Sequence, residues 1–128
     1  MGIVIGIDVG ISTTKIVGIV EQGKVLSPIR IKATDPVTSL YGAFGKFLYV
    51  NKIQLQDIEK VMLTGVGSAY INEPIYNLPT EKAEEFIADG LGARYETKLD
   101  RMIVVSMGTG TSIVKCDGED IKHIGGIG

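Results

Sequence analysis

The 128-residue sequence predicts an α/β fold, in which a mixed sheet with helices is followed by the first three strands of a second, similar domain. Two observations lead to this prediction: the order of apolar patterns along the chain, and an internal repeat near its end. Apolar residues make up 45% and charged residues 22% of the chain, as in soluble globular proteins. We place the domain boundary after residue 100, which gives domains over residues 1–100 and 101–128.

Three antiparallel strands are expected at the amino-terminal end. The run Ile3–Asp8 is β-branched and nearly continuous, which is typical of a strand covered on both faces. A tight turn separates it from a second strand over Thr14–Val20, and another turn leads to a third strand over Val25–Lys32. Pro28 suits an edge position in this third strand.

A helix, a strand and a second helix complete the first domain. Asp35 followed by Pro36 is typical of a helix N-terminus, and apolar residues then recur at helical spacing. Ile58–Thr64 is predicted to be a short buried strand. The second helix is expected to have Thr80 as its N-cap and to run towards Gly92, with acidic residues in its first turns. The predicted order is β-β-β-α-β-α.

The opening pattern returns near the carboxyl end. Residues 103–115 repeat the strand, glycine-rich turn and strand of residues 5–17, which matches Gly10 with Gly108. A turn at Cys116–Glu119 then precedes another strand. We interpret this pattern as an internal duplication, with a complete first copy and a second copy limited to its first three strands.

Composition and charge exclude several functional classes. Lys and Arg number 13 against 15 Asp and Glu, so no basic footprint for nucleic acid or an anionic membrane is present. The first apolar run stops at Asp8 and lacks a basic region, which is unlike a signal peptide or a transmembrane helix. A single cysteine, Cys116, and a single histidine, His123, exclude an internal disulfide and a His/Cys metal cluster. A reducing cytoplasm is the expected location.

The two glycine-rich turns are candidate phosphate-binding loops. The first consists of Asp8, Val9, Gly10, Ile11, Ser12, Thr13, Thr14 and Lys15. The second consists of Gly108, Thr109, Gly110 and Thr111. Backbone amides and hydroxyls in such hairpins can surround a phosphate, and a carboxylate can hold Mg²⁺ directly or through water.

Plain hairpins with solvated turn residues are the alternative explanation. The presence of two copies favours ligand binding, because two facing loops would hold the phosphates of a nucleotide from both sides. The second copy has Ser106 where the first has Asp8, so metal binding is expected at Asp8.

Taken together, the motifs resemble type II pantothenate kinases, which belong to the acetate and sugar kinase, heat-shock chaperone and actin superfamily. The motifs that carry the resemblance, in order along the whole chain, are Gly6–Gly10, Leu63–Gly65, Glu85-Phe86, Gly90–Gly92, Ser106–Ser112 and Ile124–Gly128. The resemblance implies ribonuclease-H-like (actin-like ATPase) domains, and transfer of the γ-phosphoryl group of MgATP to the hydroxyl of pantothenate in coenzyme A biosynthesis. It also implies that Asp8 lies near Mg²⁺, and that Lys15 and Thr109 lie near ATP.

The same resemblance implies a glutamate base early in the second helix. In the family this residue stands in a Glu-Phe context, which assigns it to Glu85 before Phe86, with Glu84 as the reserve candidate. The base would accept the proton of the primary hydroxyl of the substrate as its oxygen attacks the phosphoryl group. These glutamates could instead form a solvated face that complements the helix dipole.

The segment expected to bind the phosphate acceptor, just before the last glycines, departs from the family pattern. Before the last glycines the resemblance implies an arginine for the pantothenate carboxylate, whereas this chain has Lys122 and His123. Neither reproduces the bidentate fork of an arginine. We take Glu85, His123 and Gly125 as candidate binding residues for pantothenate or a similar alcohol, while His123 could also point from a strand to solvent.

Two other functions stay open at this point. One is the ATPase activator of a radical dehydratase, which resembles this chain at the first loop but bridges a dimer with a cysteine-held iron–sulfur cluster. Cys116 alone is wrongly placed for that cluster. The other is a non-catalytic half-kinase or nucleotide-binding regulatory subunit. Related kinases continue past the segment that ends at Gly128, so we expect a missing carboxy-terminal portion, a homodimer when complete, and little activity in the isolated chain.

Overall fold

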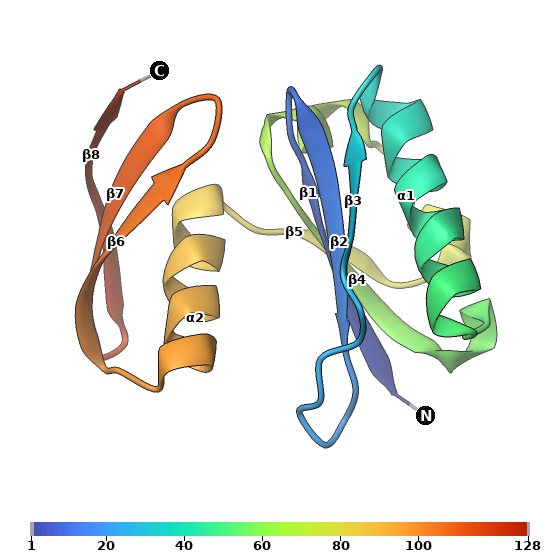
Figure 1. The fold of residues 1–128 in the computed structure, drawn as a ribbon, viewed down its shortest axis with the longest axis horizontal. Helices are drawn as coiled ribbons and strands as arrows, with labels where there is room; N and C mark the ends of the chain where they lie inside the picture. The colour runs from blue at the N-terminus through green and yellow to red at the C-terminus, as the bar shows by residue number, and fades with distance from the viewer. Residues whose placement is uncertain (1, 128) are drawn as a thin grey trace. The chain divides into compact units, whose positions relative to one another are not determined.

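The computed structural model describes residues 2–127, which form two compact units, residues 2–82 and residues 83–127 (Figure 1). The elements of the first unit are β1 (Ile3–Val9), β2 (Thr13–Ile19), β3 (Ile29–Lys32), α1 (Pro36–Asn51), β4 (Ile58–Thr64) and β5 (Thr80–Lys82). Short 3₁₀ helices cover Leu55–Asp57, Val66–Tyr70 and Ile75–Asn77. The elements of the second unit are α2 (Glu85–Thr97), β6 (Arg101–Met107), β7 (Thr111–Asp117) and β8 (Asp120–Ile127).

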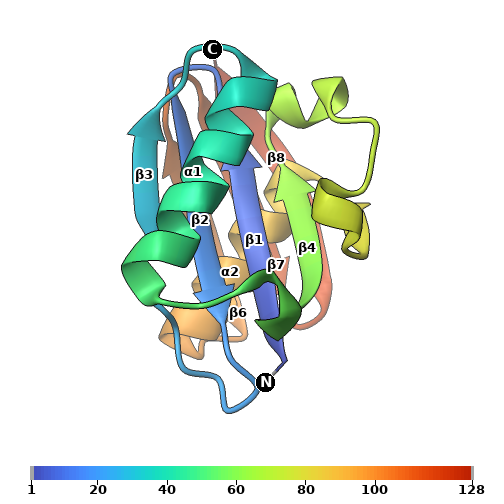
Figure 2. The same cartoon turned by 90° about the vertical axis from the view of Figure 1, so that its right-hand side faces the viewer.

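The first unit is built on a mixed sheet with the strand order β3-β2-β1-β4-β5. β1 pairs antiparallel with β2 and parallel with β4, which in turn pairs parallel with β5. Alternate residues of β1 are fully buried beneath α1, which crosses this face of the sheet (Figure 2): Ile3, Ile5, Ile7 and Val9. The residues between them are partly exposed, so the expected burial of this strand on both faces is wrong.

Helix α1 begins as predicted, because its capping signal is local. The Asp35 Oδ1 atom accepts a hydrogen bond of 3.0 Å from the backbone N–H of Thr38, and Pro36 occupies the first turn. Hydrogen bonds from Thr38, through its side chain and then its backbone, lower the pKa of Asp35. The helix buries one face against the sheet through Ser39, Leu40, Ala43, Phe44 and Phe47.

The third strand is shorter than predicted. It covers Ile29–Lys32 rather than Val25–Lys32. Val25 makes only an isolated bridge with Ile19. Pro28 lacks the N–H group that a ladder hydrogen bond requires, so regular pairing starts after it.

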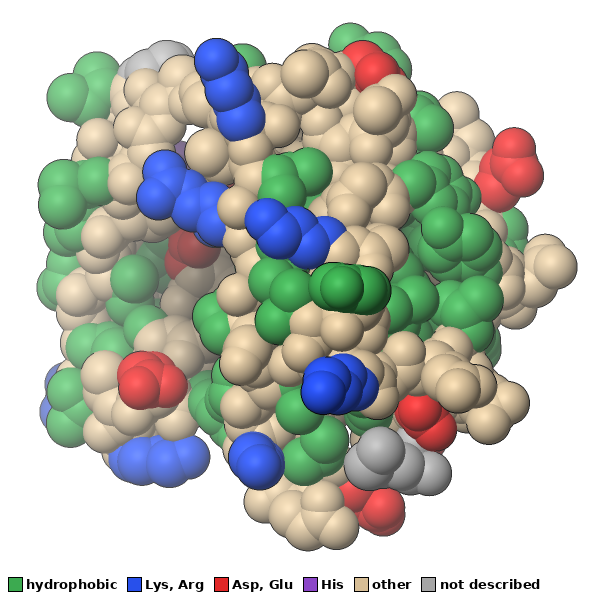
Figure 3. All heavy atoms as spheres, turned by 45° about the vertical axis from the view of Figure 1, so that its right-hand side comes forward, with side chains coloured by type: hydrophobic (Ala, Val, Ile, Leu, Met, Phe, Trp, Pro, Cys, Tyr) green, Lys and Arg blue, Asp and Glu red, His purple; other side chains and the backbone are tan. Residues whose placement is uncertain are grey.

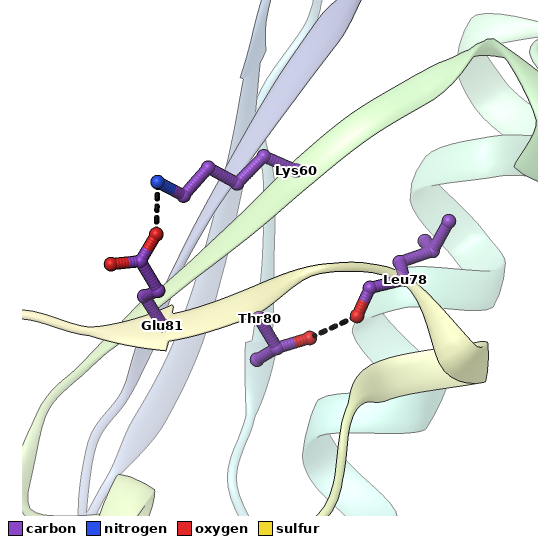
Figure 4. A network of polar contacts seen from close by, with 4 residues as sticks. All are labelled: Lys60, Leu78, Thr80 and Glu81. Carbon is purple, nitrogen blue, oxygen red and sulfur yellow. Dashed lines mark hydrogen bonds and ion pairs between the residues drawn. The ribbon is translucent and has the colours of Figure 1, made fainter.

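Thr80 does not cap a helix, and this prediction is wrong. It begins β5, a short strand that the predicted order β-β-β-α-β-α lacks. The Thr80 hydroxyl donates a hydrogen bond of 2.9 Å to the carbonyl of Leu78 (Figure 4). It also accepts a hydrogen bond of 3.0 Å from the N–H of Ile75. On the neighbouring strands Lys60 and Glu81 form an ion pair, also drawn in Figure 4. Pairing with β4 therefore overrides the local helix signal at this position.

Helix α2 starts four residues later than predicted, because its N-cap residue is Glu84 rather than Thr80 and its first residue is Glu85. It lies on one face of the antiparallel sheet β6-β7-β8 (Figure 1). Gly90 permits close packing there, because a Cβ atom on it would lie 2.8 Å from Ile121 Cγ2 and 3.1 Å from Cys116 Sγ. Cys116 is buried and belongs to β7, so the predicted turn at Cys116–Glu119 begins later than expected, after Asp117.

The contacts of α2 place it in the second compact unit. Compactness does not show where a duplicated segment begins, so the boundary after residue 100 stays a prediction. Over residues 2–127, no helix is both long and apolar enough to cross a bilayer.

Candidate functional site

A row of polar side chains crosses the first sheet near the carboxyl ends of β1 and β4. Asp8 lies on the face away from α1, because side chains alternate along a strand and its neighbours Ile7 and Val9 are buried in the core. The register places Lys15 of β2 and Thr64 of β4 opposite Asp8. Paired residues share a face of the sheet, so these three side chains are neighbours.

The Asp8 carboxylate is only partly satisfied. Its Oδ2 atom lies 3.9 Å from Lys15 Nζ, while its Oδ1 atom is buried and makes no hydrogen bond. The Thr64 hydroxyl oxygen is also buried without a partner. Burial raises the pKa of Asp8, and the charge of Lys15 offsets this in part. Buried polar atoms of this kind are uncommon in native proteins, and carboxylate oxygens are the ligands that Mg²⁺ prefers.

Close backbone packing holds this carboxylate in place. Gly65 has a φ angle of +92°, and a Cβ atom on it would lie 2.5 Å from both Asp8 Oδ1 and the carbonyl oxygen of Val9. A Cβ atom on Gly67 would lie 2.6 Å from Val9 Cγ1. The Ser68 hydroxyl donates a hydrogen bond of 2.7 Å to the carbonyl of Gly65 and stabilises this turn. The chain after β4 therefore runs against the end of β1.

Thr64 and Gly65 are absent from the predicted site. Their signal in the sequence is the pair Gly65 and Gly67 after a buried apolar strand. Glycines at such a position predict that the backbone lies close to a neighbouring segment or a ligand. The identity of that neighbour depends on the parallel pairing of β1 with β4 and is not visible in a local pattern.

The first predicted loop forms a tight hairpin. The N–H of Gly10 donates a hydrogen bond of 3.0 Å to the carbonyl of Thr13, and a Cβ atom on Gly10 would lie 2.5 Å from that oxygen. The Ser12 carbonyl accepts a hydrogen bond of 2.9 Å from the N–H of Ala33, which ties the turn to the chain after β3. Ile11 and Ser12 are exposed at the tip.

Two predicted members of this loop have side chains in the core. Val9 and Thr14 pair with each other across the hairpin, and both are fully buried. The Thr14 hydroxyl oxygen is buried without a hydrogen-bond partner. These residues contribute to the hairpin through its backbone ladder, on the opposite face from the Asp8 side chain.

The second predicted loop repeats the topology of the first but not its register. Ser106 pairs with Ser112, whereas the matching residue in the first hairpin, Asp8, pairs with Lys15. The repeat alignment matches Lys15 with Ile113, so the second register is shifted by one residue. Its turn, residues 108–110, is exposed and is closed by a hydrogen bond of 2.8 Å from the N–H of Gly108 to the carbonyl of Gly110.

The candidate acceptor residues lie in the second unit. His123 of β8 pairs with Val114, which is buried beneath α2, so His123 is on the helix side of the sheet. Its imidazole centroid lies 6.1 Å from the ring centroid of Phe86. The structure therefore brings His123 to the first turn of α2, next to the residue that follows Glu85, although its side chain remains exposed. Gly125 lies beyond a β-bulge and pairs with Ile113.

No group of three or more His, Cys, Asp or Glu side chains converges to hold a metal ion within residues 2–127. A Mg²⁺ ion at Asp8 would therefore take most of its oxygen ligands from phosphates and water, as Mg²⁺ commonly does in nucleotide-binding sites. The free Oδ1 atom of Asp8 fits that arrangement.

The sequence matches part of a group of curated kinases. The type II pantothenate kinase of Staphylococcus aureus strain USA300 is 33% identical over 129 residues, which cover 97% of this chain and 43% of that protein. The protein of the bovine strain RF122 / ET3-1 is 32% identical with the same coverage. The chain thus spans less than half the length of these relatives. No protein-family model matches it.

Solved structures share the fold at low sequence identity. The activator of the 2-hydroxyisocaproyl-CoA dehydratase from Clostridium difficile, with bound ADPNP, has a TM-score of 0.79 at 16% identity, covering 95% of this chain and 45% of that one. Component A of the (R)-2-hydroxyglutaryl-CoA dehydratase from Acidaminococcus fermentans has a TM-score of 0.81 at 12% identity, covering 97% and 48%.

A kinase is also among these structures. The ROK family glucokinase from Streptomyces griseus, in complex with glucose and AMPPNP, has a TM-score of 0.63 at 16% identity, covering 94% of this chain and 46% of that one. These likenesses confirm the predicted fold class, an actin-like ATPase fold with a mixed sheet. The chain therefore has the fold of about half of an actin-like ATPase and resembles, in sequence, the amino-terminal part of type II pantothenate kinases.

Proposed function

We propose that this chain is the amino-terminal part of an ATP-dependent kinase of the type II pantothenate kinase kind. The observation that carries the proposal is the row of Asp8, Lys15 and Thr64, where two side-chain oxygens are buried without partners beside a lysine. A carboxylate and an ammonium group held together at the end of a buried strand suit a metal–phosphate ligand, because they complement the cation and the anion respectively.

In this proposal three residues of the first hairpin have distinct tasks. The Lys15 ammonium is exposed on one side and contacts phosphate oxygens, while Asp8 holds Mg²⁺ through Oδ1. When bound, Mg²⁺ neutralises charge on the phosphates. Gly10 allows the tight turn that brings the backbone close to the nucleotide. Further ATP contacts are assigned to the second hairpin, at Gly108, Thr109, Gly110 and Thr111.

The proposed base is Glu85, at the start of α2. It accepts the proton from the acceptor hydroxyl as that oxygen attacks the γ-phosphoryl group. His123 packs near Phe86 at the same end of the helix, so its imidazole can donate a hydrogen bond to the acceptor. Gly125 is the third proposed acceptor contact.

The proposed acceptor is pantothenate or a similar alcohol, which places the reaction in coenzyme A biosynthesis. The support is the 33% identity to the staphylococcal enzymes. The complete kinase is proposed to contain a further carboxy-terminal portion, because those relatives are more than twice as long as this chain. A homodimer in the cytoplasm is part of the same proposal and follows from the resemblance to these kinases.

A chimera tests the reaction. Residues 1–128 are fused to the segment that follows the matched region in the USA300 enzyme, and ATP-dependent phosphorylation of pantothenate is measured. Glu85→Gln should lower kcat by about 10²- to 10⁴-fold, the usual contribution of a general base. Glu84→Gln, one residue earlier, is the matched control and should retain activity. Full activity of the Glu85→Gln chimera would overturn the assignment of the base.

A binding measurement tests the nucleotide site independently of catalysis. Lys15→Met should weaken the affinity of the chimera for AMPPNP with Mg²⁺ by roughly tenfold or more, since it removes a charge-assisted contact to phosphate. Lys46→Met, on the exposed side of α1, is the control and should leave the affinity unchanged. A chimera that binds AMPPNP but transfers no phosphoryl group would favour a non-catalytic regulatory subunit.

The dehydratase activator remains a second candidate, because the Clostridium difficile activator and the Acidaminococcus fermentans component A have higher TM-scores than the glucokinase. That function requires a cysteine-held cluster. Cys116 is the single cysteine of the chain and is buried beneath α2, where the Gly90 Cβ position would lie 3.1 Å from its sulfur. Iron analysis of an anaerobic preparation separates the two functions, since stoichiometric iron would favour the activator.

A further inference from the structure

The first turn of α2 brings two acidic side chains and one imidazole to the same end of the second unit. Glu84 is the N-cap residue of the helix and Glu85 is its first residue. The ring of His123 on β8 lies 6.1 Å from the ring of Phe86, the next residue of this turn. The charge around these residues decides which acceptors they favour, because a like charge disfavours a ligand and an opposite charge favours it.

Lys122 is next to His123 in the sequence but lies on the other face of the sheet. His123 pairs with Val114, which is buried beneath α2, whereas Lys122 pairs with Lys115. Successive residues of a strand point to opposite faces, so the Lys122 ammonium is directed away from the helix. It lies 3.4 Å from Asp120 Oδ2 in an ion pair. Figure 3 shows hydrophobic side chains projecting along the edge of the view that the β6–β8 sheet forms.

Arg94 is also directed away from the first turn of α2. It lies in the last turn of this 13-residue helix, which is roughly 20 Å long. Its guanidinium donates a hydrogen bond to the carbonyl of Gly118, in the turn between β7 and β8. Arg94 is therefore committed to the end of the unit that lies far from Glu85.

The remaining cations of residues 83–127 lie at that far end or on the face away from α2. Lys98 follows the last turn of α2, and its Nζ atom lies 4.5 Å from the centroid of the Tyr95 ring. Arg101 begins β6 and forms an ion pair of 3.2 Å with Asp117. Lys115 is on the same face as its pairing partner Lys122. Within the described part of the second unit, no Lys or Arg side chain thus serves the first turn of α2.

The helix dipole does not replace the cations. The N-terminus of a helix carries the equivalent of about half a positive charge. Glu84 and Glu85 place two carboxylates at this position, and these outweigh the dipole when both are ionised. The first turn of α2 therefore has a negative local charge from the residues of its own unit.

We propose that the acceptor is a primary alcohol whose other end is an uncharged amide and not a carboxylate. This inference rests on the proposed function, because it takes Glu85 as the base and His123 as an acceptor contact, and it narrows the acceptor from pantothenate or a similar alcohol to a neutral one. A neutral imidazole has one hydrogen-bond donor and one acceptor, which match the carbonyl and the N–H of a carboxamide. A carboxylate in the same place is repelled by the two glutamates and gains no ion pair.

A matched pair of ligands tests the inference. Pantothenate and its primary amide differ only in that a carboxylate becomes a carboxamide of similar size. Their dissociation constants are measured on the chimera of residues 1–128 with the USA300 segment, in the presence of AMPPNP and Mg²⁺. The amide should bind at least roughly tenfold more tightly than pantothenate, because it avoids the repulsion by the glutamates.

Substitutions at two neighbouring positions separate the faces of the sheet. His123→Arg adds a guanidinium beside Phe86 and should tighten the binding of pantothenate roughly tenfold or more, without a similar gain for the amide. His123→Gln retains a neutral hydrogen-bonding group and should keep the preference for the amide. Lys122→Met, on the face away from α2, is the matched control and should leave both dissociation constants unchanged.

The outcomes distinguish this inference from the proposed function. Equal or tighter binding of pantothenate than of the amide would overturn the inference and leave the kinase proposal intact. Weaker binding of pantothenate by Lys122→Met would also overturn it, since Lys122 would then serve the carboxylate. Binding of neither ligand by a chimera that binds AMPPNP would overturn the proposed acceptor site, and this inference with it.

Discussion

A Cβ atom on Gly65 would lie 2.5 Å from Asp8 Oδ1, so the absence of a side chain after β4 makes room for the carboxylate at the end of β1. The Oδ1 atom has no hydrogen-bond partner, whereas the Oδ2 atom forms an ion pair with Lys15 at 3.9 Å. Such an arrangement lowers stability, since a buried polar atom is unsatisfied, and it leaves that atom available to a ligand.

Substitution of Gly65 should therefore be costly. Gly65→Ala introduces a side chain at a φ of +92° and against two oxygens, and should lower the free energy of unfolding by about 2–4 kcal/mol. Urea unfolding provides the measurement. The matched control is Gly45→Ala in α1, where nothing lies within 4 Å of the Cβ position. It should raise stability by about 0.5–1 kcal/mol. Equal midpoints for the two variants would contradict this view of Gly65.

The raised pKa of Asp8 predicts how stability changes with pH. A carboxyl group whose pKa is raised by folding stabilises the fold below its unfolded pKa, near 3.8, and this contribution is lost as the pH rises through the folded pKa. At pH 7 the ionised Asp8 therefore opposes folding. Asp8→Asn should unfold at a higher temperature than the parent chain at pH 7, and the difference should shrink below pH 4. Its affinity for AMPPNP with Mg²⁺ should fall.

Asp35 serves as the control, because folding shifts its pKa in the opposite direction to that of Asp8. Hydrogen bonds from Thr38 lower its pKa, so its contribution is present above its unfolded pKa and is lost as the pH falls through the folded pKa. Asp35→Asn should leave the thermal midpoint equal or slightly lower at pH 7, since asparagine also caps helices. A lower midpoint for Asp8→Asn than for the parent chain at pH 7 would refute the assigned sign.

Two glycines of α2 should respond in opposite directions to the same substitution. Gly90→Ala would place a Cβ atom 2.8 Å from Ile121 and should destabilise the second unit by about 1–3 kcal/mol. Gly92→Ala meets nothing within 4 Å and should stabilise the helix by about 0.5–1 kcal/mol. The labelling rate of the Cys116 thiol measures both effects, because this residue lies beneath the helix. It should rise in the first variant and fall in the second.

Local signals were sufficient for much of the fold. β1, β2 and β4 follow from short β-branched runs, and α1 follows from Asp35 and Pro36 at its first turn. β5 was missed, because three polar residues show no pattern and their strand forms only by pairing with β4. The same pairing explains why Thr80 was mistaken for a helix cap.

Part of the candidate site can be predicted from the sequence. Asp8, Gly10 and Lys15 carry the chemistry of a phosphate-binding loop wherever the chain places them, so their residue types were enough to nominate them. Strand register decides that Asp8 and Lys15 lie in one row with Thr64. It also decides that the Thr14 side chain lies in the core. Register is a long-range property, and a shift of one residue moves every side chain to the other face.

In the internal repeat, too, the sequence determines the local pattern and the tertiary structure determines its burial. The apolar pattern of β1 recurs in β6 and is readable from the amino acids alone, because alternation is a local property. Whether that pattern is buried depends on a neighbouring element: α1 covers Ile7, whereas Val105 is half exposed. Burial requires a partner surface, so similar apolar patterns lead to a core in one unit and to an exposed face in the other.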